Sequence, residues 1–447
     1  MVTTSLLKKI IITLLIALGY LYGAFGLGKS EAAELISVAL VQGQSTAEIT
    51  CESEFEIQSG GSDTVLPKGK YFLHIVDDKL VMEAASENGK QVAFASALYI
   101  KPVAGKAIPK VNERAYKGFV RAVVRQDKLL LVNYVDMEDY VASVLPAKTM
   151  VVWPDEAIKA QAVAARTYGL YRRQQGQRSD FDVAATDKEL PYLGTGSRIE
   201  KAGITKLIAS TRGQYLVDAK GLPLMAVTTS SSGGLTEAAS GAWGREVSYL
   251  QSVTDYDSDS PDYKWEHRAT PALLEGQLAQ RGYAVGKLNS VRLSPLDTPD
   301  DDRTATGRVR YVILSGSAGT AKITGEELAD IIGLKSALFD VETGTPPPET
   351  LKVPIEDRYG FEVGSKDIDI EVKEEERPVW NKLLRSYHML SGGKEEKLIF
   401  HGRGKGSGLG LSAWGARGMV VENEKITYAQ ILEYYYPGTR LVKWKED

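Results

Sequence analysis

Several residue types that carry chemistry are scarce in this sequence. Its 447 residues include one cysteine, Cys51, and four histidines. A single cysteine cannot form an internal disulfide, and it excludes a zinc site built from several cysteines. So few histidines leave little material for another metal centre, and we predict neither a metal nor a cofactor. The net charge of −4 provides no global positive field, so we expect no nucleic-acid partner.

The overall composition is that of a globular protein. Hydrophobic residues make up 43% of the chain and charged residues 25%, which excludes a wholly disordered chain, a collagen-like repeat and a polytopic membrane protein. At roughly 100–200 residues per domain, the length allows two or three domains, or one large domain with insertions.

The N-terminus has the features of an export signal. Lys8 and Lys9 precede an apolar run, Ile10–Leu27, and a small-residue site follows at Ser30-Glu31-Ala32. This order predicts a secretory signal peptide, and an uncleaved anchor remains the alternative because the run approaches bilayer-spanning length. Residues 1–33 are therefore expected to be a signal peptide or membrane anchor. Either one places the protein outside the cytoplasm, at the outer face of the membrane or in the cell wall.

The pattern of the following residues predicts an α+β fold. Short β-type runs alternate with turn residues up to about residue 145, at Leu35–Val41, Glu48–Ile57, Tyr71–Val76, Phe119–Val124 and Lys128–Tyr134. Pro154 and the acids after it mark a helix start. Five alanines between positions 157 and 165 suit a helix that crosses the core, so a site should flank this helix. We expect a mostly antiparallel β core packed on this Ala-rich helix.

A change in composition near the C-terminal end predicts an inserted segment. Residues 344–396 contain a proline run and a long charge run, which are typical of a solvated β-type arm. We therefore expect the main domain to cover 34–343 and to resume over 397–447. Two more strands, at Asn289–Ser294 and Arg308–Leu314, and helices at Gly325–Gly333 and Tyr428–Tyr436 complete the expected elements.

Two segments have the composition of binding surfaces. The hydroxyl-rich segment, Thr228–Glu237, suits sugar binding, with a flexible linker as the alternative; the aromatic residues that follow it favour a glycan chain. The glycine-rich segment, His401–Gly418, carries Arg403 and Lys405 between glycines. It suits an anionic group such as a lactyl carboxylate or a phosphate, with a structural tight turn as the alternative.

These motifs resemble the stage II sporulation protein D (SpoIID/LytB) family. The resemblance rests on Tyr140–Pro146, Trp153-Pro154, the Ala-rich helix, Ser232–Glu237 and Gly408–Gly418. It also includes Trp243 with Tyr249-Leu250, Gly333–Ser336 and Tyr435–Gly438, and it extends over roughly residues 35–440. The family implies a cell-wall protein that acts on peptidoglycan, either as a lytic transglycosylase or as an enhancer of a partner hydrolase.

The resemblance also shows where this chain departs from the family pattern. The family's catalytic Glu position is Lys148 here, and its His is Ser407. Thr229 stands where the family often has another His, and Phe181–Thr186 lacks the cysteine of the corresponding loop. A lysine, with an ordinary pKa of about 10.4, is a poor substitute for a carboxylic acid in proton transfer near pH 7. Glu237 is the fallback acid, although a structural role for its carboxylate is the simpler interpretation.

The sequence therefore predicts an exported protein that binds peptidoglycan glycan strands and is catalytically diverged. The alternative is an active lytic transglycosylase that leaves 1,6-anhydro-MurNAc ends, so the sequence does not decide whether this is an enzyme. A cell-wall hydrolase or another membrane-associated protein is the expected partner. The residues predicted to bind substrate are Lys148, Ser231, Ser232, Glu237, Arg403, Lys405, Ser407 and Trp414.

Overall fold

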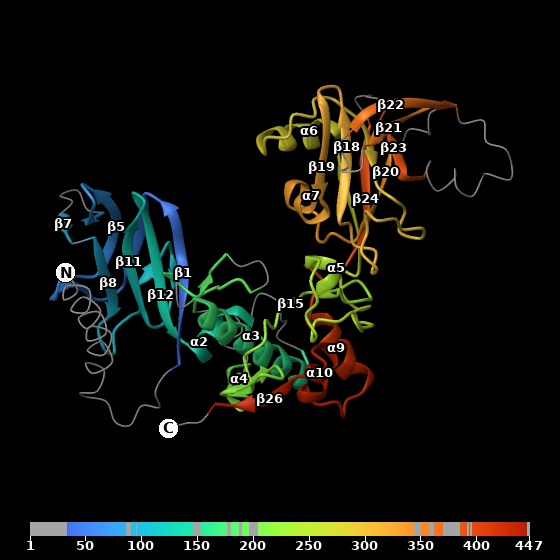
Figure 1. Cartoon of the computed structure of the whole chain (residues 1–447). Helices are drawn as coiled ribbons and strands as arrows, with labels where there is room; N and C mark the ends of the chain where they lie inside the picture. Colours follow the sequence, from blue (N-terminus) through green and yellow to red (C-terminus); the bar gives the residue numbers. More distant parts are fainter. Residues whose placement is uncertain are drawn as a thin grey trace, which may run out of the picture.

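The protein consists of a first lobe, made of N-terminal β-sheets and a helical middle part that share one core, and a second lobe (Figure 1). A computed structural model describes residues 34–85, 91–94, 96–145, 153–176, 180–186, 190–195, 204–343, 350–356, 362–369, 385–390, 393 and 396–444. The expected signal peptide or anchor over residues 1–33 and the position of Lys148 lie outside these residues.

Two mostly antiparallel sheets form the N-terminal part. Their strand orders are β13-β1-β12-β11-β8-β3-β4 and β10-β9-β2-β5-β6-β7. The predicted run Glu48–Ile57 is divided between β2 and β3, because polar residues 52–54 form a turn inside it. The strand bounds are β1 Leu35–Gln44, β2 Thr46–Cys51, β3 Phe55–Ser59, β4 Ser62–Leu66, β5 Gly69–Val76, β6 Lys79–Ala84, β7 Gln91–Ala93, β8 Ala97–Pro102, β9 Lys110–Val111, β10 Arg114–Ala115, β11 Phe119–Arg125, β12 Lys128–Asp136 and β13 Val183–Ala184.

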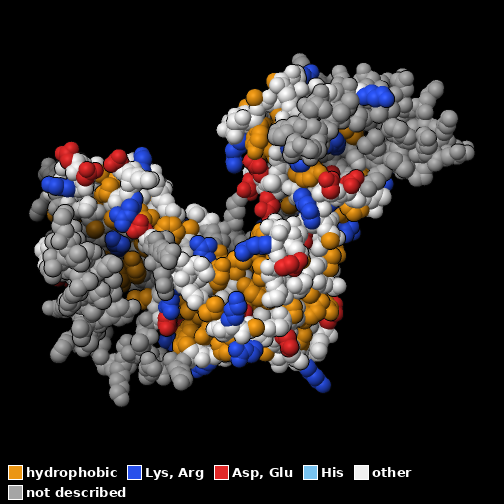
Figure 2. Space-filling view, viewed as in Figure 1, with side chains coloured by type: hydrophobic (Ala, Val, Ile, Leu, Met, Phe, Trp, Pro, Cys, Tyr) orange, Lys and Arg blue, Asp and Glu red, His pale blue; other side chains and the backbone are white. Residues whose placement is uncertain are grey.

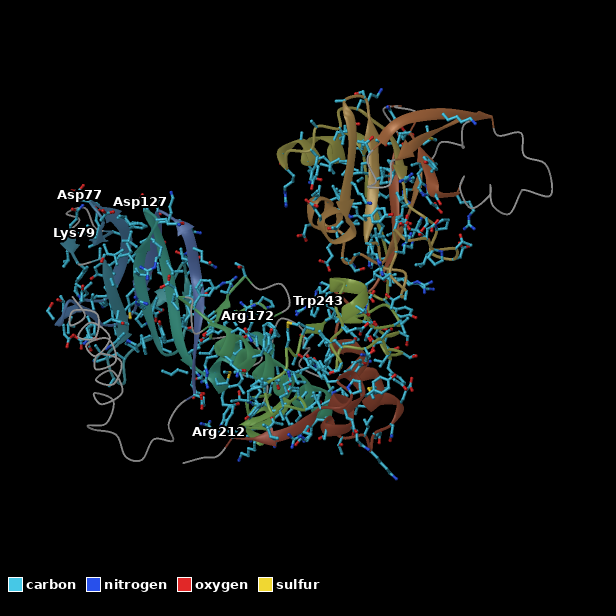
Figure 3. All side chains as sticks on the ribbon, viewed as in Figure 1. Asp77, Lys79, Asp127, Arg172, Arg212 and Trp243 are labelled. Carbon is cyan, nitrogen blue, oxygen red and sulfur yellow. The ribbon has the colours of Figure 1, made fainter. Side chains whose placement is uncertain are left out.

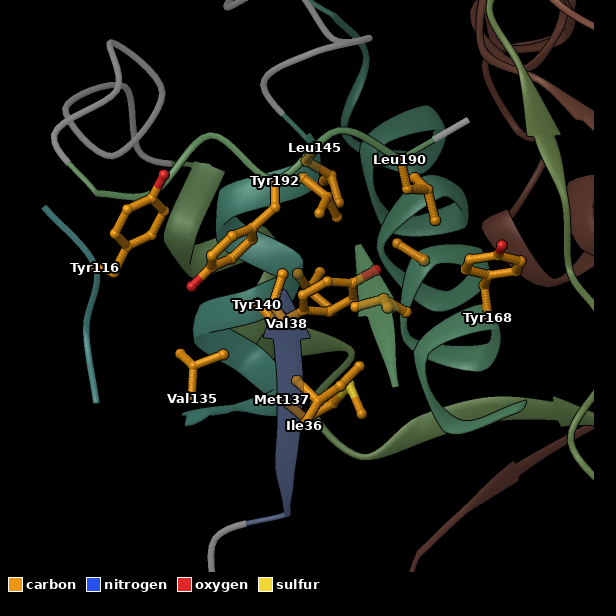
Figure 4. Close-up of a cluster of buried hydrophobic side chains, with 14 of the residues drawn as sticks. Ile36, Val38, Tyr116, Val135, Met137, Tyr140, Leu145, Tyr168, Leu190 and Tyr192 are labelled. Carbon is orange, nitrogen blue, oxygen red and sulfur yellow. The ribbon is translucent and has the colours of Figure 1, made fainter. Parts of the chain in front are cut away.

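The Ala-rich sequence forms the central helix α3, Asp155–Gly176. Its residues from Ala157 to Leu170 are buried, apart from Lys159. Small side chains allow close approach: a Cβ at Gly169 would lie 3.1 Å from Met137 Sδ and 3.2 Å from Ile36 Cδ1. Helix α3 therefore packs on α2, Met137–Val144, and on the sheet, in the core drawn in Figure 4. Helix α4, Ile204–Ser210, also contacts it.

The second lobe has a hydrophobic core of its own. Residues from Trp265 to Val341 form it, and the chain returns to it at Leu398 and Phe400. The expected insertion over 344–396 therefore leaves and rejoins this lobe. The elements are β16 Lys264–Ala269, α6 Pro271–Gln280, β17 Leu288–Arg292, β18 Tyr311–Gly316, β19 Gly319–Thr324, α7 Gly325–Ile332, β20 Phe339–Thr343, β23 Tyr387–Met389 and β24 Leu398–Arg403.

The inserted segment contains an antiparallel hairpin, β21 Thr350–Glu356 and β22 Glu362–Asp369. It projects from the second lobe in Figure 1. The remaining elements join the two lobes or belong to the helical part: β14 Gln214–Val217, β15 Thr228–Thr229, α5 Ala239–Trp243, β25 Leu411–Ser412, α9 Ala413–Glu422, α10 Tyr428–Tyr435 and β26 Arg440–Lys443.

The predicted α+β class is confirmed, including the antiparallel core, the Ala-rich helix and the β-type arm. Within the described ranges, no helix combines the length and the apolar character needed to cross a membrane.

Candidate functional site

The hydroxyl-rich and glycine-rich segments, about 175 residues apart in sequence, are joined by backbone hydrogen bonds. Strand β15 pairs in parallel with β25. Beyond it, the Ser231 N–H donates to the Lys405 carbonyl at 3.2 Å, and the Lys405 N–H donates to the Ser231 carbonyl at 2.7 Å. The Glu237 N–H then donates to the carbonyl of Gly408 at 2.9 Å. The two segments that stood out in the sequence therefore form one structural unit.

Glycine is required in this unit because neighbouring backbone and side-chain atoms lie so close to these positions. Gly404, Gly408 and Gly410 have φ angles of 70°, 79° and 64°, which favour residues without a Cβ. A Cβ at Gly408 would lie 2.2 Å from Arg308 Nη2, and one at Gly410 would lie 2.1 Å from the Val227 carbonyl oxygen. The glycine pattern thus serves close packing, whatever the segment binds.

Two buried carboxylates accept hydrogen bonds from the serines of the hydroxyl-rich segment. Ser231 Oγ donates to Asp257 Oδ2 at 2.5 Å, and Ser232 Oγ donates to Asp255 Oδ2 at 2.6 Å. The Tyr435 hydroxyl donates to Asp255 Oδ1 at 2.6 Å. Burial, and then the nearby Asp257, raise the pKa of Asp255. The hydroxyls of both serines are therefore turned inward, and any contact of this segment with a ligand has to use other atoms.

Glu237, the fallback acid, is buried and bonded to the second lobe. Its Oε2 accepts hydrogen bonds from Thr304 Oγ1 at 2.6 Å and from the hydroxyl of Thr306, while Oε1 accepts from the Ala238 N–H at 2.9 Å. Its side chain is 1% exposed. These contacts suit a carboxylate that ties the lobes together; its role as an acid or a substrate contact stays a prediction.

The glycine-rich segment presents its charged side chains to solvent. Arg403 and Lys405 are exposed, and Ser407 is half-buried. Lys405 Nζ lies 3.7 Å from Asp262 Oδ2, and Lys335 Nζ lies 2.6 Å from Asp262 Oδ1. Two lysines thus share one carboxylate beside the segment.

A groove of about 320 Å³ lies beside these lysines. Helix α7 and the residues after it form one wall, and Lys405, Gly406 and Ser407 contribute the other. The Gly406 N–H donates to the Lys335 carbonyl at 2.9 Å and fixes the walls together. This charged groove is lined mainly by Glu326, Asp330, Leu334, Lys335, Lys405 and Ser407.

Lys148 falls outside the described residues, but the described residues on either side of its segment contact the site. Leu145 lines a small cavity together with Leu411 and Ala413. The ring of Trp153 meets that of Trp414 edge-on, with the centroids 5.2 Å apart. Trp414, a predicted substrate contact, is half-buried here.

The aromatic residues after the hydroxyl-rich segment differ in exposure. Trp243 is 38% exposed, and the Arg245 guanidinium lies 5.5 Å from its ring centroid. Figure 3 shows Trp243 on α5, below the second lobe. Trp265 is instead buried, and its Nε1–H donates to the Gly404 carbonyl at 2.8 Å. Of these two indoles, only that of Trp243 has a face available to a ligand.

Sequence reasoning missed several residues that build this site. Asp255 and Asp257 belong to a run in which every second residue is an acid, and this pattern could have pointed to them. Lys335 lies inside the motif Gly333–Ser336, but nothing in the sequence marked it as a site residue, and no local pattern marked Arg308. Arg308 is buried and donates to the Ser232 carbonyl at 2.9 Å and the Gly406 carbonyl at 3.3 Å. Across the described part of the chain, no three His, Cys, Asp or Glu side chains are grouped as a metal site would require.

Comparison with known proteins gives consistent matches. Residues 125–217 match a family model described as stage II sporulation protein. Stage II sporulation protein D of Bacillus subtilis (strain 168) is 25% identical over 69% of this chain and 75% of its own length. The amidase enhancer of the same organism is 25% identical over 67% of this chain, but the match spans only 40% of that protein. An uncharacterized protein of Brachyspira hyodysenteriae is 26% identical over 75% of this chain and 74% of its own length.

Proposed function

We propose that this protein, which belongs to the stage II sporulation protein D family, is an exported cell-wall protein that binds peptidoglycan glycan strands without cleaving them. The observation that carries the binding proposal is the pairing of the hydroxyl-rich and glycine-rich segments. This pairing supports the exposed side chains of Arg403 and Lys405 on a rigid backbone beside a groove. A preorganised polar surface of this kind loses little conformational entropy when a ligand binds.

The proposed loss of catalysis rests on the residues at the family's catalytic positions. Lys148 replaces the acid that would protonate the glycosidic oxygen, and Ser407 replaces a histidine. Glu237 is the fallback acid, and its carboxylate is buried among hydroxyl donors of the protein itself. A carboxylate engaged in this way is poorly placed to exchange protons with a sugar.

We also propose a partner hydrolase, because one relative carries the name amidase enhancer. A protein that holds glycan strands without cutting them would raise the local concentration of substrate for a bound hydrolase.

Binding is tested first by sedimentation of the purified protein with insoluble peptidoglycan. We expect co-sedimentation that weakens with salt, because exposed charges are screened. A soluble protein that stays in the supernatant at low salt would remove the basis of the proposal.

Catalysis is tested by mass spectrometry of the soluble products from the same incubation. We expect no 1,6-anhydro-muropeptides from the parent, and little from Lys148→Glu, because a misplacement near 1 Å costs about a hundredfold in rate. Anhydro products that the parent releases and Lys148→Ala does not would establish the transglycosylase alternative. Products that survive Lys148→Ala and vanish in Glu237→Gln would assign the acid to Glu237.

A further inference from the structure

We propose that Trp243 is a sugar-stacking position, at which the open face of the indole binds a pyranose ring of the glycan strand. The inference rests on the proposed function, because it assigns one further contact to the same ligand. This contact is uncharged, which separates it from the contacts of Arg403 and Lys405. It is carried by the placement and the surroundings of the Trp243 side chain.

Trp243 lies outside both hydrophobic cores, unlike the other tryptophans of the described ranges. Trp153 and Trp265 are core residues, and Trp414 and Trp444 pack against a core. The side chain of Trp243 is 38% exposed, although burial of an indole removes a large apolar area from water. Folding therefore leaves this ring on the surface, where a ligand can cover it.

Helix α5 brings Trp243 to the edge of the candidate site. The helix closely follows Glu237 in the sequence, and a Cβ at Gly241 would lie 2.4 Å from Glu237 Oε1 and 3.4 Å from Thr304 Cβ. The helix therefore packs on the contact between the two lobes. It ends at Trp243, because Gly244 adopts a left-handed φ of 66°. The indole is thus held on a short helix that is fixed to the site.

Arg245 orients the indole and leaves one of its faces open. Its guanidinium lies 5.5 Å from the Trp243 ring centroid, a cation–π arrangement that favours one orientation of the ring. Beside the ring, a Cβ at Gly244 would meet nothing within 4 Å. An aromatic face that is already oriented loses little conformational entropy when a ligand stacks on it.

The surroundings of the indole suit a sugar better than a protein partner. Ala242, Gly244, Arg245 and Glu246 are all exposed, so small and charged residues surround the aromatic ring. Figure 2 shows basic and acidic side chains close together where the second lobe meets the rest of the molecule, the region of α5 in Figure 1. Protein interfaces instead place such an anchor inside a larger desolvated core.

A pyranose ring matches these surroundings in size and chemistry. It covers a single aromatic ring, and its C–H bonds meet the negative face of the π system. Its hydroxyl and acetamide groups then lie beside Arg245 and Glu246, which offer hydrogen-bond donors and acceptors. The position therefore suits one amino-sugar unit of the strand.

The first test measures co-sedimentation of the full chain with peptidoglycan at low and at high salt. Trp243→Ala should weaken binding about fivefold at both salt concentrations, because stacking involves no net charge and is not screened. Trp243→Phe keeps a smaller aromatic face and should bind more tightly than Trp243→Ala but less tightly than the parent.

Phe72→Ala is the matched control for this test. Phe72 is 41% exposed, Lys70 Nζ lies 5.7 Å from its ring centroid, and its strand β5 lies well away from α5 in Figure 1. This variant should bind like the parent. A loss equal to that of Trp243→Ala would show that any exposed aromatic ring contributes, and would contradict the assignment.

The outcomes separate this inference from the proposed function. Equal binding by the parent and by Trp243→Ala at high salt would overturn the stacking position and leave glycan binding standing. A parent that does not sediment with peptidoglycan would overturn both proposals. A folded Trp243→Ala that sediments like the parent but no longer stimulates an amidase would assign the indole to a protein interface, and so would overturn the stacking position.

The second test titrates a short, neutral, soluble oligomer of N-acetylglucosamine and follows tryptophan fluorescence. The emission of the parent should change on binding, and Trp243→Phe should lose most of that change while its unfolding temperature stays the same. Phe72→Ala should keep the change. A change of the same size in Trp243→Phe, or none in the parent, would contradict the assignment of the sugar to this indole.

Discussion

The hydroxyl-rich and glycine-rich segments look alike in sequence, yet they face opposite environments. Both are rich in small residues, and both suggested a ligand surface. Ser231 and Ser232 are fully buried and donate to Asp257 and Asp255, whereas Arg403 and Lys405 are exposed. A segment's composition thus limits which side chains it can present to a ligand. The buried hydrogen-bond acceptors packed against the segment then decide which of those side chains remain available.

Removal of a buried carboxylate that accepts hydrogen bonds from the hydroxyl-rich segment should lower the free energy of unfolding more than any other change proposed here. Asp257→Ala would leave the buried Ser231 hydroxyl and the Gly233 N–H without this acceptor, and the free energy of unfolding should fall by about 3 kcal/mol. Chemical denaturation measures this change. The control Asp259→Ala removes an exposed partner of Arg417 and should cost less than about 1 kcal/mol. Similar losses for both variants would show that the buried network contributes little.

In the glycine-rich segment, stability should depend on the glycines rather than on the charged side chains. Gly408→Ala adds a Cβ 2.2 Å from Arg308 Nη2 at a φ of 79°, and we expect it to destabilise the protein by about 2 kcal/mol. Gly438→Ala is the matched control: its φ is 74° and nothing lies within 4 Å of the new Cβ, so about 1 kcal/mol is expected. Thermal unfolding of both variants separates steric overlap from backbone strain. Equal shifts would mean that Arg308 moves aside freely.

The buried network should also respond to pH. Burial, then Asp257, raise the pKa of Asp255. Its stabilising contribution is therefore fully present below the unfolded pKa of about 3.9 and is lost as the pH rises through the folded pKa. Asp255→Asn cannot ionise, so its stability should improve relative to the parent as the pH increases above about 4. Urea unfolding across this range measures the difference, and a constant offset between the two proteins would contradict the prediction.

The exposed charges should have the smallest effect and should change binding alone. Arg403→Ala/Lys405→Ala should leave the unfolding temperature nearly unchanged and weaken retention by peptidoglycan roughly fivefold at low salt, with the difference shrinking at high salt. Co-sedimentation at several salt concentrations measures this effect. A folded double variant that binds like the parent would exclude these two side chains as the contact surface.

Local signals in the sequence were sufficient for much of the fold. Alanine spacing and the acids after Pro154 predicted α3, whose bounds are Asp155–Gly176. The β-type runs predicted β1, β5, β11 and β12 to within a few residues. These elements follow from periodicity and capping, which neighbouring residues encode. The sequence did not reveal the second core, because its parts lie on both sides of the inserted segment.

The sequence by itself indicated the resemblance to the stage II sporulation protein D family, the α+β class and the two segments that pair in the candidate site. Motif order and local periodicity can be read from the sequence without knowing any tertiary contact. Only the tertiary structure decided that the two segments pair, that Glu237 faces Thr304, and that Lys335 and Lys405 border one groove. These contacts join residues from 67 to 176 positions apart, and their geometry follows from the packing of both lobes rather than from any local preference.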